Sequence, residues 1–190
     1  MPSAFNTHNT NPLVQFPQAW ERAGKVKLLV LDVDGVLTNG QVWIGADGKE
    51  SLKAFDIQDG LGIKLLEQCG IPTVIITGRN SKMVLARCEE LGIQHVHMGV
   101  ENKALALEQV LKALGLNVAD CAVMGDDWPD LAMMKNAGMR VCPAQAHEAV
   151  KEFAHLVTTH TGGDSAVREL CDLILKAQNR YEDLLKKALS

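Results

Sequence analysis

The sequence lacks a long apolar run and a basic leader, and both absences narrow the possible locations of the protein. No stretch of the 190 residues approaches eighteen consecutive apolar residues, so we expect no membrane-spanning helix. The first twenty residues lack a basic segment followed by an apolar one, which argues against a secretory signal. The sequence thus predicts a cytoplasmic protein with no membrane partner.

Paired cysteines and a basic charge balance are also missing. The five cysteines are scattered, and none is spaced as CxxC; they are Cys69, Cys88, Cys121, Cys142 and Cys171. We interpret them as small buried apolar residues of a reducing compartment, not as metal ligands or disulfide partners. The formal net charge is −4, whereas nucleic-acid-binding surfaces are basic. No nucleic-acid partner is therefore expected.

Length and composition predict one domain. With 47% hydrophobic residues, 190 residues can bury a single sizeable core. Residues 1–24 begin with a segment rich in Asn, Thr, Pro and Gln, and we expect them to form a flexible N-terminal arm. Residues 25–190 are then the folded domain.

Short apolar runs alternate with segments of helical periodicity through this domain. The most apolar run, residues 27–33, suits a strand that is buried on both faces of a parallel sheet. Further strands are expected at 72–77, 94–98, 120–124, 139–142 and 155–157, and helices at 61–69, 81–91, 103–114, 131–137 and 165–187. The alternation predicts an α/β fold, with an open parallel sheet and helices on both faces. Ligands of such sheets bind at the carboxyl ends of the strands.

Residues 40–55 depart from the alternation. Two short segments flank Asp47-Gly48, which is a typical turn dipeptide, so we expect a β-hairpin inserted after the first strand. Val42, Ile44 and Leu52 lie on this hairpin without a core of their own. Because an isolated two-stranded hairpin is marginal in water, we expect these residues to mediate oligomerisation.

The first strand ends in two aspartates, in the sequence Asp32-Val-Asp34-Gly35-Val-Leu-Thr38. Residues two apart on a strand share a face, so Asp32 and Asp34 initially point the same way. Gly35 then allows a sharp turn. Clustered carboxylates repel each other unless a cation lies between them, and Mg²⁺ prefers such oxygen ligands. A pair of solvated turn residues is the alternative interpretation of this motif alone.

Three more motifs follow in order, and the four together resemble the haloacid dehalogenase superfamily. Thr77-Gly78-Arg79 follows the second strand, Lys103 begins a helix, and the segment Gly-Asp-Asp-Trp-Pro-Asp at 125–130 follows a later strand. The resemblance implies a haloacid dehalogenase-like Rossmannoid fold and a magnesium-dependent phosphatase.

The resemblance also implies the catalytic and metal-binding roles. Asp32 is the expected nucleophile, which forms an aspartyl-phosphate. Asp34 is the expected general acid and base. Mg²⁺ is expected to be held by Asp32, Asp126 and the backbone carbonyl of Asp34.

Four further residues are expected to act on the phosphoryl group or to support the site. Thr77 is expected to donate its hydroxyl and its backbone N–H to a phosphoryl oxygen, and Lys103 to place its ammonium against the same group. Asp127 and Asp130 are expected to hold water or to orient Lys103.

The spacing of the motifs leaves no room for a cap domain. The segment from Asp34 to Thr77 already holds the hairpin and a helix, and the segment from Thr77 to Lys103 one helix and one strand. We therefore expect a capless enzyme with an open site. Such a site must either accept a macromolecule or be covered by a neighbouring subunit.

Within the superfamily, residues 25–178 are similar to the 3-deoxy-D-manno-octulosonate 8-phosphate phosphatases. The similarity is strongest in residues 33–41, 53–64 and 162–175. It implies that substrate, a place in lipopolysaccharide biosynthesis, and a homotetramer whose four hairpins form a central barrel.

The same resemblance implies substrate contacts from the loop after the hairpin and from nearby cationic residues. These are Asp34, Asp56, Ile57, Gln58, Asp59, Gly60, Lys64, Gly78, Arg79, Arg87 and Lys103. Cationic contacts suit a substrate that bears a carboxylate as well as a phosphate. Solvated positions on helices are the alternative interpretation of Lys64 and Arg87.

Two departures from the family pattern leave the exact sugar open. Many members have Arg at the position of Gln58 and Asn at that of Asp56, so another acidic sugar phosphate, such as acylneuraminate 9-phosphate, is the alternative substrate. A phospho-accepting receiver domain is a more distant alternative, but its acceptor aspartate would follow the third strand, where residues 98–101 have none. The complete motif set argues against a catalytically silent scaffold, and the acidic charge balance against a polynucleotide-end phosphatase.

Overall fold

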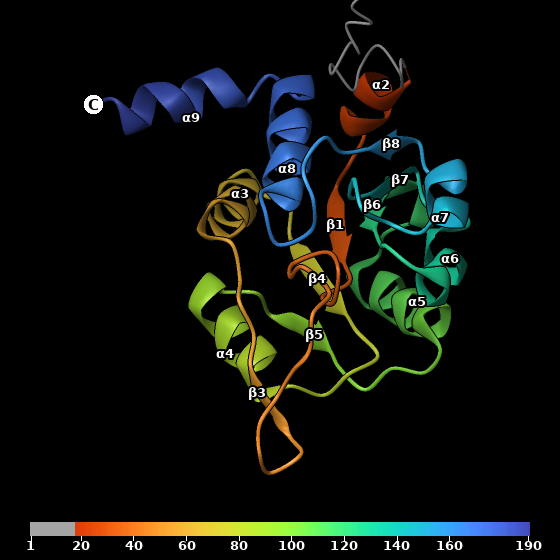
Figure 1. The fold of residues 1–190 in the computed structure, drawn as a ribbon. Coiled ribbons are helices and arrows are strands. Elements are labelled where there is room, and N and C mark those ends of the chain that lie inside the picture. Colours follow the sequence, from red (N-terminus) through yellow and green to blue (C-terminus); the bar gives the residue numbers. More distant parts are fainter. Residues whose placement is uncertain (1–17) are drawn as a thin grey trace, which may run out of the picture.

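A six-stranded parallel sheet forms the centre of the molecule, as the computed structural model describes it for residues 18–190 (Figure 1). The strand order is β5-β4-β1-β6-β7-β8. The strands are β1 (Leu28–Leu31), β4 (Thr73–Ile76), β5 (His95–His97), β6 (Cys121–Met124), β7 (Met139–Cys142) and β8 (Leu156–Val157). The predicted fold class is confirmed, and every predicted strand is present with bounds shifted by a few residues.

The central strand β1 fixes the position of the site. All four of its side chains are buried, and it pairs in parallel with β4 on one side and with β6 on the other. Strands β4 and β5 therefore lie on one side of β1, and the later strands β6, β7 and β8 lie on the other. In open α/β sheets this arrangement leaves a crevice at the carboxyl ends of the strands, where Asp32 follows β1.

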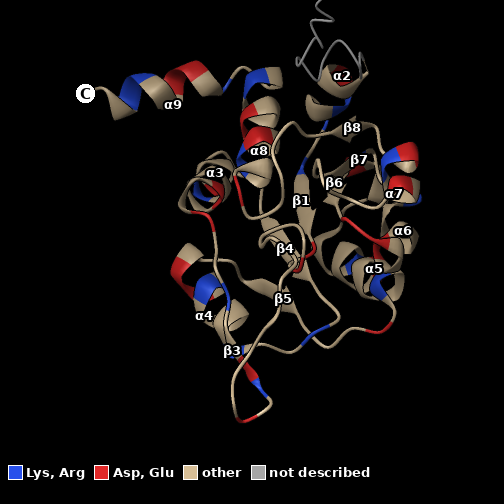
Figure 2. Ribbon diagram, viewed as in Figure 1, with Lys and Arg blue, Asp and Glu red and all other residues tan. Residues whose placement is uncertain are grey.

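Helices cover both faces of the sheet and bury two apolar clusters (Figure 1). One cluster includes residues of α2 (Ala19–Ala23), α3 (Ile57–Gln68), α4 (Lys82–Leu91) and α8 (Ala166–Ala177), and the other residues of α5 (Lys103–Leu114), α6 (Trp128–Met134) and α7 (Glu148–Phe153). A 3-10 turn (Val118–Asp120) precedes β6, and α9 (Tyr181–Ala188) extends away from the body. Strands β1, β4 and β5 contain no Lys, Arg, Asp or Glu, and most residues of these types lie on the helices and loops (Figure 2).

The predicted hairpin insert is present. Strands β2 (Trp43–Ile44) and β3 (Glu50–Leu52) pair antiparallel and project from the body (Figure 1). Gly48 has a φ of 73°, a left-handed conformation that glycine adopts at little cost in a tight turn. Within the described residues, the segment from β1 to β4 holds only this hairpin and α3, so the capless prediction agrees with the fold.

The N-terminal part of the domain begins earlier than predicted. Residues 19–23 form α2, in which Ala19 and Ala23 are fully buried, and Arg22 Nη1 donates a hydrogen bond of 2.7 Å to the Gly138 carbonyl. The expected arm therefore ends before α2, because two alanines spaced by one turn pack into the core. Residues 1–17 of that arm lie outside the described residues.

The predicted C-terminal helix is two helices, which corrects the expected single span 165–187. Asn179 has a φ of 57° and separates α8 from α9. The Arg180 N–H donates to the Leu175 carbonyl at 2.8 Å, which closes the end of α8 in the manner of a helix C-cap. Across residues 18–190, no helix has the length and apolar character that a membrane span requires.

Candidate active site

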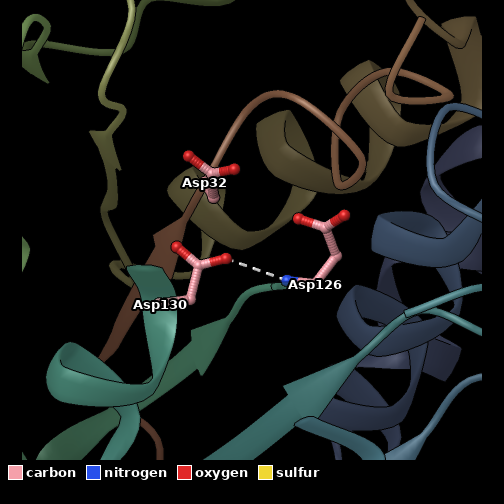
Figure 3. A group of neighbouring side chains, drawn as sticks. All are labelled: Asp32, Asp126 and Asp130. Atoms are coloured by element: carbon pink, nitrogen blue, oxygen red, sulfur yellow. Dashed lines mark hydrogen bonds between the residues drawn. The ribbon is translucent and has the colours of Figure 1, made fainter. Parts of the chain in front are cut away.

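Three aspartates converge at the carboxyl end of the sheet. Asp32 follows β1, Asp126 follows β6 and Asp130 lies in the first turn of α6 (Figure 3). Each contributes one carboxylate oxygen to a group whose atoms all lie within 4.8 Å of one another. Because parallel strands end at the same edge, residues almost one hundred positions apart form one acidic site.

Lys103 joins two of these aspartates. It is the first residue of α5, and its Nζ lies 2.7 Å from Asp32 Oδ1 and 2.6 Å from Asp130 Oδ1. The three side chains are at most 7% exposed. A lysine ammonium has three hydrogen-bond donors, so one donor of Lys103 remains for a ligand.

Asp130 is fully engaged by the protein. Its second oxygen accepts hydrogen bonds from the N–H groups of Asp126, at 2.9 Å, and of Asp127, at 3.3 Å. Asp127 caps α6, with its carboxylate accepting from the Trp128 N–H at 2.8 Å. Asp130 thus orients Lys103 and the loop of Asp126, whereas Asp127 fixes the start of the helix.

The crowding of carboxylates changes their protonation. Burial raises the pKa of Asp126 to about 7, and the negative charges of Asp130 and Asp32 add to this. Burial, followed by the charge of Asp130, also raises the pKa of Asp32, although Lys103 opposes the change. The positive charge of Lys103 therefore does not offset the effect of burial on the pKa values of Asp32 and Asp126.

The residues at this site fit a hard divalent cation. Since both oxygens of Asp130 are already engaged, Asp32 and Asp126 are the carboxylates that can act as ligands. Gly35 makes room for Asp126, because a Cβ at Gly35 would lie 2.0 Å from Asp126 Oδ2. Two oxygen ligands at a crowded acidic site suit Mg²⁺.

Asp34 lies beside this cluster but faces a different set of charges. Its Oδ1 accepts a short hydrogen bond from Lys53 Nζ, and its Oδ2 lies 3.8 Å from Arg79 Nε. Lys53 Nζ is also 2.9 Å from Glu50 Oε1, and Arg79 Nη2 is 3.6 Å from the same oxygen. Two cations and two carboxylates thus join the base of the hairpin to the end of β1.

Thr77 lies at the site, but one of its predicted contacts is not possible. Its backbone N–H donates to the His97 carbonyl at 2.9 Å, as part of the sheet, and so cannot bind a phosphoryl oxygen. The hydroxyl of Thr77 accepts a weak hydrogen bond of 3.4 Å from the Arg79 N–H and can still donate. No described hydrogen bond uses the Gly78 N–H, which is therefore the backbone donor next to the site.

These groups line a shallow pocket of about 320 Å³. Its lining residues are Asp32, Asp34, Gly40, Thr77, Gly78, Arg79, Lys103, Asp126, Asp127, Pro129 and Asp130. The structure thus brings together all the predicted catalytic and supporting residues. Gly40 and Pro129 were not among the predicted site residues, because neither has a side chain that signals chemistry.

The substrate contacts predicted at the start of α3 lie outside this pocket. Asp56 is the N-cap of α3, where its carboxylate accepts from the N–H groups of Gln58 and Asp59 and from the Ser165 hydroxyl. Ile57 is 83% exposed. Gln58 lines a separate cavity of about 560 Å³, most of whose other lining residues belong to α8 and to the loop before it.

Asp59 and Gly60 are packed against neighbouring helices. Asp59 is 1% exposed, and its Oδ1 accepts from the Arg168 N–H at 2.7 Å. Gly60 leaves room for Arg87, since a Cβ at Gly60 would lie 2.3 Å from Arg87 Nη2.

The two cations predicted beyond this loop are also outside the pocket. Arg87 Nη2 donates to the Asp56 carbonyl and Nη1 to Glu90, both at 2.9 Å, so this guanidinium holds the start of α3 against α4. Lys64 is exposed on α3. In a single subunit, neither cation reaches the carboxylate cluster.

Lys53 and Glu50 are the contacts that the sequence did not predict. Lys53 begins the stretch 53–64 that is similar to the family, and Glu50 lies just before it. Lys53 is nineteen positions from Asp34 in the sequence, so its contact with Asp34 is not a local one. The local sequence around a lysine on a hairpin does not show whether its side chain is exposed or is buried in an ion pair. Only the path of the chain distinguishes the two cases.

Known proteins with this fold include several close relatives. Residues 96–170 match the model of the haloacid dehalogenase-like hydrolases. The 3-deoxy-D-manno-octulosonate 8-phosphate phosphatase KdsC of Salmonella typhimurium is 41% identical over 167 residues, which is 88% of both chains. The enzyme of that name from Escherichia coli K12 is 42% identical over 85% of this chain and 86% of its own.

This chain belongs to the 3-deoxy-D-manno-octulosonate 8-phosphate phosphatase family. It is a phosphoric monoester hydrolase of the haloacid dehalogenase superfamily, as the sequence motifs predicted.

Solved structures agree with this membership and with the predicted metal. The Moraxella catarrhalis enzyme, described in complex with magnesium, phosphate and KDO, has a TM-score of 0.86 and 43% identity, covering 90% of this chain and 97% of its own. The cobalt-bound enzyme of Haemophilus influenzae has a TM-score of 0.84 and 34% identity, covering 89% and 99%. Two members of the family are thus described with a bound divalent metal, and the donor set of this chain suits Mg²⁺.

Proposed function

We propose that this enzyme hydrolyses 3-deoxy-D-manno-octulosonate 8-phosphate to the free sugar acid and phosphate, with Mg²⁺. The observation that supports this most is the joint placement of Asp32, Asp126 and Lys103 in one pocket, in a chain of this family. We also propose that the reaction serves lipopolysaccharide biosynthesis, as the family resemblance implies. Five cysteines without a disulfide fit the proposed cytoplasmic location.

In the first half of the proposed reaction, Asp32 attacks the phosphorus in line with the leaving oxygen. A new bond forms between Asp32 and phosphorus while the bond from phosphorus to the sugar oxygen breaks. Asp34 gives its proton to that oxygen, because a sugar alkoxide is a poor leaving group. A bound Mg²⁺, held by Asp32 and Asp126, would offset the repulsion between the attacking carboxylate and the phosphate.

In the second half, water attacks the phosphorus of the aspartyl-phosphate. Asp34, now ionised, accepts the proton of that water, and the bond between phosphorus and Asp32 breaks to release phosphate. Lys103 can hold a phosphoryl oxygen with its remaining donor, and Thr77 can do so with its hydroxyl.

The two departures from the family pattern do not create a free negative charge in the substrate loop. The carboxylate of Asp56 is used to cap α3 and to bind Ser165, so it fills a structural position that an asparagine also suits. Gln58 replaces a cation, and this loss is the specific observation that favours acylneuraminate 9-phosphate as a second candidate substrate.

We further propose a homotetramer that completes the substrate site. The hairpin exposes Val42, Trp43, Ile44 and Leu52, which are between 40% and 59% exposed in one subunit. Such a patch on a projecting hairpin suits burial between subunits. Of the predicted contacts outside the pocket, the exposed residues Ile57 and Lys64 would then be available to a neighbouring subunit.

A phosphate-release screen tests the proposed substrate. The panel contains 3-deoxy-D-manno-octulosonate 8-phosphate, acylneuraminate 9-phosphate and a neutral hexose phosphate, each with Mg²⁺. We expect the highest kcat/KM for the octulosonate, because the substrate carboxylate needs a cationic site such as Arg79. A higher kcat/KM for the hexose phosphate would contradict the proposal, and a higher value for the nine-carbon acid would favour the second candidate.

A further inference from the structure

Lys53 occupies an unusual position for a lysine. Its side chain is 1% exposed, although it lies just after β3 at the base of an otherwise exposed hairpin. Burial of an ammonium is costly unless the charge is paired. Here the charge is paired twice, with Asp34 Oδ1 and with Glu50 Oε1 at 2.9 Å.

The burial of Lys53 excludes a direct contact with substrate. Lys53 does not line the pocket in which Asp32, Asp34 and Arg79 meet. It therefore approaches Asp34 from the protein side, and any effect on the reaction passes through Asp34. Arg79, by contrast, is 48% exposed and lines the pocket.

Lys53 also distinguishes the two oxygens of Asp34. Oδ1 accepts its short hydrogen bond from Lys53, whereas Oδ2 lies on the side of Arg79. With Oδ1 held, the carboxylate of Asp34 has one orientation, and Oδ2 is the oxygen left to exchange a proton in the pocket. Glu50 holds Lys53 in turn, with an exposed fraction of only 11% for its side chain.

We propose that Lys53 is a positioning residue for proton transfer to the leaving group, acting by fixing Asp34 so that Oδ2 faces the leaving oxygen. This inference rests on the proposed phosphatase function. It also links the hairpin to the chemistry, since the residue that fixes Asp34 belongs to the hairpin base.

Two substrates with different leaving groups separate this role from a general structural one. A sugar oxygen needs a proton to leave, whereas nitrophenolate leaves without one. We expect Lys53→Met to lower kcat/KM for 3-deoxy-D-manno-octulosonate 8-phosphate about 10-fold or more, and kcat/KM for p-nitrophenyl phosphate less than about 3-fold. The ratio kcat/KM is compared because it reports the steps through departure of the leaving group, and not the later attack of water that both substrates share. Lys53→Arg should retain part of the activity on the sugar phosphate that Lys53→Met loses, because a guanidinium can also donate to Oδ1.

The double variant with Asp34→Asn tests whether Lys53 acts through Asp34. Asp34→Asn alone should give the same selective loss, and adding Lys53→Met should cause no further selective loss. The matched control is Lys49→Met, which removes an exposed hairpin lysine for which no ion pair is found among residues 18–190, and both activities should stay unchanged.

Equal losses of kcat/KM on both substrates after Lys53→Met would overturn the proposal, and so would the absence of any loss. An additional selective loss in the Asp34→Asn background would overturn it as well. Failure of the proposed function is distinguishable, because it would appear in the wild-type enzyme as no magnesium-dependent phosphate release.

Discussion

Asp59 is a carboxyl group buried where α3 meets α8. Its Oδ1 accepts the Arg168 N–H, and its Oδ2 is buried without a hydrogen-bond partner among the described residues. Burial raises the pKa of Asp59 to about 7, although the hydrogen bond from Arg168 lowers it and the charge of Asp56 raises it further. In the folded protein Asp59 is therefore protonated below neutral pH.

This raised pKa predicts a pH-dependent stability. The unfolded chain releases the Asp59 proton near pH 3.9, so between about pH 4 and 7 the folded state binds a proton that the unfolded state does not. The contribution of Asp59 to stability is thus present at low pH and is lost as the pH rises through this window. Asp59→Asn should make the free energy of unfolding decline less steeply with rising pH in this window, by up to about 1.4 kcal/mol per pH unit.

Urea unfolding at pH 5 and pH 7.5, in chelator, measures the change. The control is Asp183→Asn, which removes an exposed carboxylate on α9 and should leave the pH dependence as in the wild type. An unchanged pH dependence in Asp59→Asn would contradict the raised pKa.

At the residue scale, the sequence predicts the side chains that follow strands and misses those placed by loops. Asp32 could be predicted because ligands of parallel sheets bind where the strands end, and Asp126 because the motif at 125–130 resembles that of the superfamily. The position of Lys53 depends on the path of a hairpin, which local sequence does not determine. Arg87 has the charge of a substrate contact, but its hydrogen bonds to Asp56 and Glu90 leave it outside the pocket of one subunit.

Most apolar side chains of the hairpin are exposed to solvent in one subunit. Trp43 is 52% exposed and Ile44 is 59% exposed. Its only described antiparallel partner is within the same hairpin, so both outer edges can pair with another chain. These features support the proposed role of the hairpin in assembly.

Ile44→Lys should therefore reduce the size of the assembly. A charged side chain at a buried interface position costs desolvation energy, so the proposed tetramer should dissociate. Light scattering should give a wild-type mass of about four 20.6 kDa chains and a lower mass for the variant. Leu105→Lys, at an exposed apolar position on α5, is the control and should keep the wild-type mass. A monomeric wild type would contradict the proposed assembly.

At the element scale, periodicity and glycine positions predict most helices but not their ends. The helix at 103–114 agrees with α5, whose C-cap Gly115 is left-handed. The helix expected at 131–137 begins three residues earlier, because Asp127 caps it and Pro129 suits its first turn. The break at Asn179 could not be predicted from periodicity, since the apolar pattern continues from α8 into α9.

At the scale of the whole molecule, the open pocket and the missing cap belong together. The carboxylate cluster, Lys103, Thr77 and Arg79 line one pocket within one subunit, whereas the substrate contacts predicted at 56–60, Lys64 and Arg87 lie outside it. The proposed phosphoryl chemistry thus uses residues of a single chain. The proposed assembly would determine which sugar is held there.

The central claim is that phosphate release depends on Asp32 and on a divalent cation. The most direct measurement is phosphate release from 3-deoxy-D-manno-octulosonate 8-phosphate by the wild type and by Asp32→Asn, each with Mg²⁺ and each with chelator. We predict turnover only in the wild type with Mg²⁺, because an amide cannot act as the nucleophile. Circular dichroism should confirm that Asp32→Asn is folded. Substantial phosphate release by that folded variant, or by the wild type in chelator, would contradict the account.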